Sequence, residues 1–456
     1  MDKITKEELI EKSKEPGKKA LKMHPFYRGK IQIMPKCQIH SHEDFGIWYS
    51  PGVAAPSEKI SKEIEKVYEY TSKWNFVAVV SDGSRVLGLG NVGPEASLPV
   101  MEGKALLFKY LGGVDAFPLC IGNENCCNTE DFISFVKLIQ PTFGGINLED
   151  ISKPKCFQIL DSLRKDPDIN IPVWHDDQQG TATVTLAALI NALEIVGKNK
   201  KEINIVFNGI GASNFAISRL LREDGFNIKD AIFVDSKGIL YEGRSDLTCP
   251  EDYKCEIAKN SNPEGLRGKL DVALKDADIL ISLSIPGPNV IKKEWIENMN
   301  QDAIVFACAN PIPEIFPWDA EEAGARIVAT GRSDFANQVN NSLGFPGIFR
   351  GTLDVRAKTI TDEMCIAAAY ELASLVEEIE GCLVEECIIP SMDYEEIFIR
   401  EAVAVGLKAI EQGLARKKLT EEELYKEAKH IIDRSQNQTK LLMKKGYIPK
   451  YENSEM

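Results

Sequence analysis

Residues 203–214 read INIVFNGIGASN, and this stretch decides the fold that the sequence predicts. The run from Ile203 to Phe207 is short and apolar, as a buried strand is, and it leads into Gly209 and Gly211. The helical pattern NFAISRLLRED follows, and the next apolar run, AIFVD, ends in Asp235. A strand, a glycine turn, a helix and an acid that closes the following strand form the dinucleotide-binding arrangement of a Rossmann fold.

The rest of the chain repeats this alternation. Apolar runs at residues 277–284, 303–310 and 326–330 leave room for helices between them, which favours a parallel sheet covered on both faces. Upstream, the expected strands are FVAVV at 76–80, VLGLG at 86–90 and VDAFPLCIG at 114–122. We therefore predict an α/β protein with three parts: an N-terminal α/β substrate and metal domain at 1–179, a Rossmann-like doubly wound domain at 180–346, and a mostly helical region at 347–456.

A second glycine loop lies upstream, in residues 86–104, VLGLGNVGPEASLPVMEGK, with a complete G-x-G-x-x-G from Gly88 to Gly93. Pro94 and Pro99 follow it, so we expect no helix directly after this loop, and no acid closes a following strand. The later loop fits its context better, although Asn214 stands in the third glycine position. Its predicted cofactor-binding residues are Gly209, Ile210, Gly211, Ala212 and Ser213.

The residues after the second Rossmann strand bear on the kind of dinucleotide. Asp235 alone favours the 2′-hydroxyl of NAD, whereas Ser236 and Lys237 beside it are able to accommodate the 2′-phosphate of NADP. We favour NADP, and NAD remains the alternative.

Composition limits the function classes. The chain has 456 residues and a formal net charge of −15, which argues against a general nucleic-acid binder or a protein of anionic membranes. The N-terminal residues resemble neither a signal nor a transit peptide, and no uncharged apolar run reaches the roughly 18 residues that span a bilayer. Eleven cysteines include no C-x-x-C pair, so we expect reduced thiols and a cytoplasmic protein. Capping boxes are predicted at Thr5 with Glu8 and at Thr420 with Glu423.

Two acidic pairs stand where apolar or glycine-rich segments meet predicted helices. They are Glu149-Asp150 in PTFGGINLEDI and Asp176-Asp177 in VWHDDQQGTA. Carboxylates at such junctions either converge on a hard divalent cation or cap the helices, and spacing alone does not choose between these.

Together these segments resemble the malic enzyme family. The resemblance runs in order through YSPGVAAP, SDGSRVLGLGNVGPEASLPVMEGKALLFK, PTFGGINLEDI, HDDQQGTA, NGIGA, ACANP and GRSDFANQVNNSLGFPGIFRG. The chain is similar to the short form of that family, without an acyltransferase-like extension.

The resemblance also implies roles for individual residues. Lys104 stands where the family has its general base, Tyr49 where it has the proton donor, and Asp176 where a carboxylate accompanies the lysine. Glu149, Asp150 and Asp177 match ligands of Mg2+ or Mn2+. The positions matched to substrate binding are Arg85, Lys104, Asn310 and Asn341, and those expected at the cofactor also include Ser284 and Asn310.

The implied reaction is the metal-dependent oxidative decarboxylation of L-malate to pyruvate and carbon dioxide with NADP, or with NAD. A lysine base must be neutral, so we expect burial and a nearby dication to bring the pKa of Lys104 from about 10.4 toward 7. The family is typically dimeric or larger, which predicts a homodimer or higher homo-oligomer. Three alternatives stay open: an amino-acid dehydrogenase type of oxidoreductase, an oxaloacetate decarboxylase without redox chemistry, and a non-catalytic nucleotide sensor.

Overall fold

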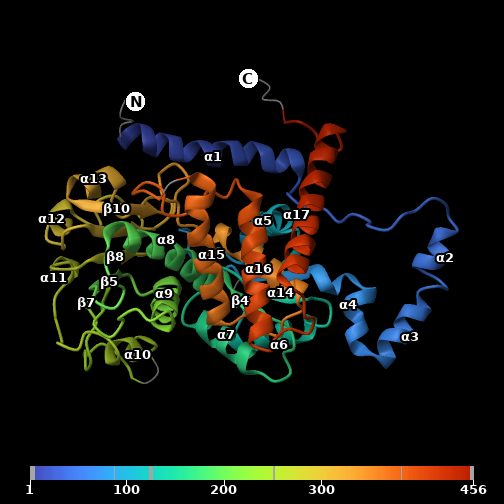
Figure 1. Cartoon of the computed structure of the whole chain (residues 1–456), viewed down its shortest axis with the longest axis horizontal. Helices are drawn as coiled ribbons and strands as arrows, with labels where there is room; N and C mark the ends of the chain where they lie inside the picture. Colours follow the sequence, from blue (N-terminus) through green and yellow to red (C-terminus); the bar gives the residue numbers. More distant parts are fainter. Residues whose placement is uncertain (1–5, 87, 123–126, 250–251, 382, 452–456) are drawn as a thin grey trace.

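The computed structural model describes residues 6–86, 88–122, 127–249, 252–381 and 383–451. Two parallel sheets with helices around them confirm the predicted α/β class (Figure 1). The predicted domain boundaries stay predictions.

The first sheet has four strands in the order β2-β1-β3-β4, and all its neighbours are parallel. Its strands are β1 Phe76–Ser81, β2 Asp115–Cys120, β3 Gly145–Leu148 and β4 Val173–His175. The connecting helices are α5 Pro94–Gly112, α6 Thr129–Ile139 and α7 Lys155–Lys165. Because the strands are parallel, the segments that follow β1, β3 and β4 emerge at one edge.

The second sheet has six strands in the order β10-β9-β8-β5-β6-β7, and only β7 is antiparallel. Its strands are β5 Ile205–Asn208, β6 Ile232–Asp235, β7 Gly238–Ile239, β8 Ile279–Ser282, β9 Ala303–Ala307 and β10 Ala325–Thr330. Its helices are α9 Ala212–Glu223, α10 Lys254–Lys259, α11 Leu270–Ala273, α12 Lys293–Ile296 and α13 Pro317–Glu322. The chain direction across the sheet switches between β5 and β8, which is where dinucleotides bind in open sheets of this kind.

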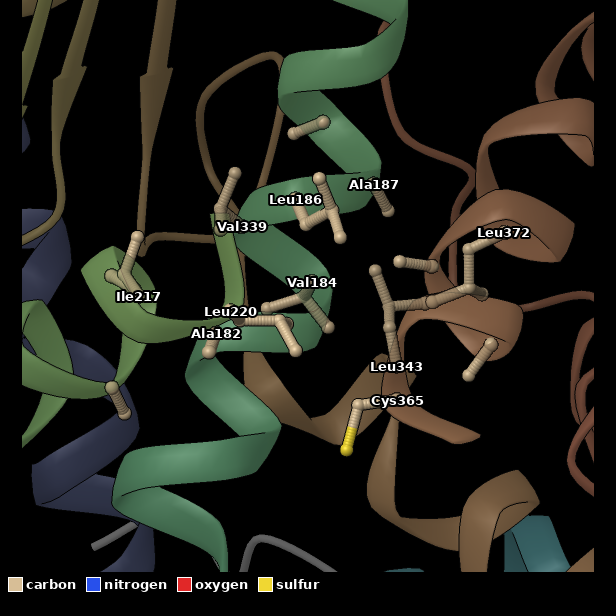
Figure 2. Packing of buried hydrophobic residues seen from close by; sticks show 14 of the residues in the cluster. Ala182, Val184, Leu186, Ala187, Ile217, Leu220, Val339, Leu343, Cys365 and Leu372 are labelled. Atoms are coloured by element: carbon tan, nitrogen blue, oxygen red, sulfur yellow. The ribbon is translucent and has the colours of Figure 1, made fainter. Parts of the chain in front are cut away.

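Helix α8 (Thr181–Val196) joins the two sheets and is buried at every residue from Ala182 to Leu189. Figure 2 shows its apolar side chains between Ile217 and Leu220 of α9 on one side and Cys365 and Leu372 on the other. The segment Asp176–Val196 is long and apolar enough to cross a membrane, but 72% of its apolar window lies inside the protein. It is therefore built as a core helix.

Four helices form the C-terminal region: α14 Phe345–Asp354, α15 Asp362–Glu380, α16 Glu395–Glu411 and α17 Glu421–Lys444. Helix α14 is buried along its whole length, and a Cβ at Gly351 would lie 2.1 Å from the carbonyl oxygen of Ala402 on α16. Helix α17 returns to α5, where Ser435 Oγ donates to the carbonyl of Lys109 at 2.6 Å. These contacts seat the C-terminal region against the helix that carries Lys104.

Part of the N-terminal segment lies away from the sheets (Figure 1). It comprises α1 Lys6–Tyr27, α2 Asp44–Trp48, α3 Ala54–Lys62 and α4 Val67–Tyr70, with single 3-10 turns at Ile64–Lys66 and Ser72–Asn75. Figure 1 shows α2 and α3 projecting well outside the body of the molecule. We call residues 28–66 the N-terminal arm.

Two sequence predictions around the first glycine loop are wrong. Among the described residues of the predicted strand at 86–90, Val86 and Gly90 form an isolated bridge and no strand, because Gly90, at a φ of 80°, turns the chain. Helix α5 begins directly after the loop: Gly93, at a φ of 82°, is its N-cap and Pro94 its first residue. Proline fits this position because the first helical N–H groups have no partner within the helix.

Two further predictions concern cysteines and caps. Cys249 and Cys255 form a disulfide, so the expectation of reduced thiols is wrong for this pair; the chain folds back and brings their Cα atoms to 5.8 Å. Among the other described cysteines, Cys37, Cys120, Cys156, Cys308 and Cys365 are free thiols. The capping box at Thr420 and Glu423 is confirmed, whereas Thr5 lies outside the described residues.

Candidate active site

The two predicted acidic pairs meet at the carboxyl edge of the first sheet. Glu149 and Asp150 follow β3, and Asp176 and Asp177 follow β4. The backbone N–H of Asp150 donates to Asp177 Oδ2 at 2.9 Å, which ties the two pairs together. The structure therefore brings together four carboxylates that the sequence places in two distant segments.

Lys104 reaches this cluster from the middle of α5. Its Nζ lies 2.5 Å from Asp176 Oδ2 and 3.1 Å from Glu149 Oε1, and the residue is 8% exposed. The ring of Phe345, at the start of α14, covers the ammonium with its centroid 4.2 Å from Nζ. The predicted pairing of Lys104 with Asp176 is thus present.

Asp176 is held from two sides. Trp174 Nε1 donates to Asp176 Oδ1 at 3.2 Å while the other oxygen accepts from Lys104. The chain makes one π-helical turn at Asp176–Gly180, and a Cβ at Gly180 would lie 2.0 Å from Asp176 Oδ1. A glycine at that position leaves the space that the carboxylate occupies.

Burial and the neighbouring charges both change the pKa values in this cluster. Burial raises the pKa of Glu149 well above its usual range, and Asp176, Asp177 and Asp150 add to the rise. Burial on its own lowers the pKa of Lys104, but attraction to Asp176 and Glu149 outweighs it, and the net direction is upward. Two carboxylates in direct contact with the ammonium account for this direction, and the expected fall toward 7, which requires a nearby dication, stays a prediction.

The acidic side chains of the cluster also bear on the predicted metal site. Within the described residues no group of three His, Cys, Asp or Glu side chains stands ready to hold an ion, since Glu149 is turned onto Lys104 and Asp177 onto the backbone of Asp150. The donor set nevertheless fits a hard divalent cation, because it consists of two buried carboxylates, Glu149 and Asp150, and the 33% exposed carboxylate of Asp177, and their negative charge exceeds that of one ammonium. Glu149, Asp150 and Asp177 remain the proposed ligands.

The later glycine loop lies at the switch between β5 and β8. Gly209 has a φ of 89°, and a Cβ there would lie 2.4 Å from the carbonyl oxygen of Leu283. A Cβ at Gly211 would meet no atom within 4 Å, so the backbone is open above that residue. Gly211 is the N-cap of α9, which starts at Ala212 without a side-chain cap. These features suit a phosphate at the helix N-terminus.

Asn214 stands in the third glycine position, and its side chain stabilises the loop through hydrogen bonds. Its side chain is fully buried, and Nδ2 donates to the carbonyl oxygens of Asn208 at 3.0 Å and Gly209 at 2.7 Å. The neighbouring Ser213 Oγ donates to the backbone carbonyl of Asp177 at 2.9 Å. The glycine loop and the carboxylate cluster are therefore joined by a direct hydrogen bond.

At the end of β6, Asp235 is already ion-paired. Its carboxylate contacts Arg244 and Lys254, which the sequence analysis missed because they lie in a loop and a short helix beyond the strand. Ser236 and Lys237 are exposed, and Lys237 Nζ pairs with Asp246 at 3.0 Å.

The remaining predicted positions are Ser284 and Asn310, which follow β8 and β9, and Asn341 and Arg85. Ser284 accepts from Asn208 Nδ2 at 3.1 Å and donates to Glu314 Oε1 at 2.9 Å, and the buried Glu314 is a further residue that the sequence analysis missed. Asn310 lies against the first glycine loop, since a Cβ at Gly88 would be 3.4 Å from its carbonyl oxygen.

Asn341 and Arg85 each lie beside a segment that carries one of the acidic pairs. Asn341 begins the 3-10 turn Asn341–Leu343 and lies beside the π-helical turn, since a Cβ at Gly180 would be 3.4 Å from Asn341 Cβ. The backbone N–H of Arg85 donates to the carbonyl of Asp150, and its exposed side chain lies close enough to lower the pKa of Asp177 against the rise caused by burial.

Tyr49 is the one predicted catalytic residue that the structure does not bring to Lys104. It caps α2 on the projecting arm and is 74% exposed (Figure 1). Within one chain the phenol of Tyr49 is exposed on the arm, whereas the amine of Lys104 is buried among the carboxylates.

Comparison with known proteins gives consistent results. Residues 28–164 match the family described as Malic enzyme, N-terminal domain, and residues 178–410 match Malic enzyme, NAD binding domain. The chain is similar to the bifunctional malic/malolactic enzyme of Bacillus subtilis (48% identity, covering 90% of this chain and 97% of that one). It is also similar to the NAD-dependent malic enzyme of Geobacillus stearothermophilus (48%, 85% and 78%) and the NADP-dependent malic enzyme of Escherichia coli (40%, 89% and 54%). The solved malic enzyme of Entamoeba histolytica superposes with a TM-score of 0.93 at 47% identity, covering 99% of this chain and 93% of that one.

Replacing Asn214 by alanine should destabilise the glycine loop, although alanine is closer in size to the glycine of the usual fingerprint. The carbonyls of Asn208 and Gly209 lose a buried donor, so urea denaturation should show the free energy of unfolding reduced by about 1–3 kcal/mol. The control Asn227→Ala, which removes a solvent-facing bond to Asp230, should change it by less than about 0.5 kcal/mol. Equal stability of Asn214→Ala and the unmodified protein would contradict the bracing role.

Proposed function

Because the chain belongs to the malic enzyme family, we propose that it converts L-malate and NADP to pyruvate, carbon dioxide and NADPH. The observation that carries this proposal is the buried Lys104 between Asp176 and Glu149, joined to the glycine loop by the hydrogen bond from Ser213 to Asp177. This arrangement combines a base, an excess of carboxylate and a dinucleotide loop in one place.

Glu149, Asp150 and Asp177 would hold Mg2+ or Mn2+, which when bound lowers the pKa of a coordinated hydroxyl and stabilises a developing enolate. A dinucleotide in the second sheet supplies the hydride acceptor. A cation on Glu149 would offset one of the charges that raise the pKa of Lys104, whereas the larger effect of Asp176 remains.

Lys104 takes the proton of the malate C2 hydroxyl through its neutral amine while the hydride leaves C2. Asp176 acts as a positioning residue, since its carboxylate and the Phe345 ring fix the direction of the amine. After the C4 carboxylate leaves as carbon dioxide, C3 must gain a proton, and we assign this step to the phenol of Tyr49.

Three side chains would bind the substrate. Arg85 is exposed beside the carboxylate cluster and suits a carboxylate of malate. Asn310 lies beside Gly88 of the first glycine loop and Asn341 beside Gly180 of the π-helical turn, and their amides can donate to the remaining substrate oxygens.

The exposed arm supports a homodimer in which each chain supplies Tyr49 to the site of the other. The arm and the end of α1 carry large apolar side chains in contact with solvent, including Ile33, Ile47 and Trp48. Burying such side chains favours association, and a second copy is a partner that also needs the phenol. We place this dimer in the cytoplasm.

An initial-rate assay tests the reaction. The protein with L-malate, NADP and Mn2+ should produce NADPH fluorescence, and a chelator should abolish it. Lys104→Ala should lower the rate by about 100-fold or more, because the base is lost. Lys109→Ala is the matched control, since it removes a partly exposed lysine of the same helix that pairs with Asp115. A Lys104→Ala protein that keeps most malate oxidation would refute the base assignment.

Mixed dimers test the shared site. Tyr49→Phe and Lys104→Ala should each be poorly active alone. In an equal mixture that is allowed to exchange subunits, half of the dimers should contain both variants, and one of their two sites should have both the lysine and the tyrosine. The expected activity is about a quarter of the unmodified protein. If subunits exchange, as mass spectrometry would show, but no activity returns, the phenol is not donated by the partner.

A further inference from the structure

Glu314 is a buried acid that links two loops at the carboxyl edge of the second sheet. It lies between β9 and α13, and its side chain is fully buried. The groups that donate to its carboxyl oxygens are serine hydroxyls and backbone N–H groups, which are uncharged. Because β8 and β9 are parallel neighbours, the loops that follow them emerge side by side at this edge.

One oxygen of Glu314 binds the loop that follows β8. Oε1 accepts from Ser282 Oγ at 2.7 Å, from the backbone N–H of Ser284 at 2.8 Å and from Ser284 Oγ at 2.9 Å. This loop packs on the dinucleotide turn, since a Cβ at Gly209 would lie 3.1 Å from Ser284 Cα. Asn208 Nδ2, at the end of β5, donates to Ser282 Oγ at 2.9 Å. Oε1 is thereby connected to the glycine loop that we assign to the dinucleotide.

The other oxygen binds the loop that follows β9. Oε2 accepts from the backbone N–H of Ala309 at 3.0 Å, directly before Asn310. Asn310 lies close to two glycines, since a Cβ at Gly88 would be 3.4 Å from its carbonyl oxygen and a Cβ at Gly331 would be 2.8 Å from its Nδ2. Oε2 is thereby connected to the asparagine that we assign to the substrate.

A buried carboxyl group is a costly way to fill this space. Burial raises the pKa of Glu314, and the hydrogen bonds from Ser282, Ser284 and Ala309 oppose that rise. An apolar side chain would occupy the same volume without needing any donor. A carboxyl group differs in accepting with two oxygens at a fixed separation, so the loops that it binds are also held at a fixed separation. The contribution of Glu314 is therefore the relative position of the two loops.

We infer that Glu314 is a positioning residue for hydride transfer, which sets the distance between the dinucleotide and the substrate by holding the loops of Ser284 and Asn310 together. This inference rests on the proposed function, which assigns the two ligands to these loops. Hydride transfer depends steeply on the distance between the reacting atoms, whereas the binding of each ligand to its own loop does not.

Steady-state kinetics of Glu314→Gln in the full-length protein test the inference. An amide accepts with only one oxygen, so one of the two loops loses its acceptor. The kcat for malate oxidation with NADP and Mn2+ should fall about 10- to 100-fold, while the KM values for malate and NADP change by less than about threefold. Malate deuterated at C2 should show a larger isotope effect on kcat than in the unmodified protein, because hydride transfer becomes the slow step. Decarboxylation of oxaloacetate, which needs no hydride transfer, should keep most of its rate.

The matched control is Asp278→Asn, at the opposite end of β8. Asp278 is also buried, and it accepts from the backbone N–H of Asn204 at 2.8 Å and from Asn300 Nδ2 at 3.1 Å. Because it lies away from both loops, its replacement should leave the isotope effect unchanged even if the protein loses stability.

Hydrogen exchange followed by mass spectrometry gives a readout that does not depend on activity. Peptides that contain Ser284 and Ala309 should exchange faster in Glu314→Gln than in the unmodified protein, and they should not do so in Asp278→Asn. If Glu314→Gln does not fold, Ser282→Ala removes one donor and leaves the carboxyl group in place. The kcat of that variant should fall about threefold, with a rise in the isotope effect.

Three results would overturn the inference. They are an equal loss of malate oxidation and oxaloacetate decarboxylation, an unchanged isotope effect in a variant whose loops exchange faster, and unchanged exchange of both loops. An unmodified protein that does not oxidise malate would refute the proposed reaction, and faster exchange in Glu314→Gln would then still support the link between the loops.

Discussion

The attraction between the Lys104 ammonium and the carboxylates of Asp176 and Glu149 is the interaction on which the site depends. Each group alone would be costly to bury, and the buried ammonium is compensated by two carboxylates in direct contact. Because Asp150 and Asp177 are joined to the same cluster, its negative charge exceeds that of Lys104, which is why we propose that it binds a cation. Asp176 and Glu149 raise the pKa of Lys104, so base function and cation binding would be coupled by electrostatics.

Direct connections between the two sheets hold this cluster in place. The π-helical turn that bears Asp176 and Asp177 continues directly into α8, the core helix of the whole chain. The hydrogen bond from Ser213 to Asp177 then links the glycine loop of the second sheet to the acids of the first. Helix α14 adds a further contact by placing the ring of Phe345 over Lys104. We propose that the substrate lies between the carboxylate cluster and the glycine loop, next to both the base and the dinucleotide.

Much of this arrangement follows from local sequence. The buried strands and α8 are predicted because apolar runs bounded by glycine have few alternatives, and the two acidic pairs meet because parallel strands end at one edge. The strand at VLGLG was wrong because periodicity does not distinguish a glycine turn from a short strand. The partners of Asp235 and the exposure of Tyr49 were not predictable, since a loop arginine, a lysine on a short helix and the path of an extended arm depend on tertiary contacts that carry no local pattern.

The central claim is that the acids of the first sheet hold a divalent cation next to Lys104. Anomalous diffraction from crystals of the protein grown with Mn2+ tests it most directly. We expect a manganese peak within coordination distance of oxygens from Glu149, Asp150 and Asp177, with Glu149 turned away from Lys104 Nζ. A peak at another place, or none here in a protein whose activity requires Mn2+, would contradict it.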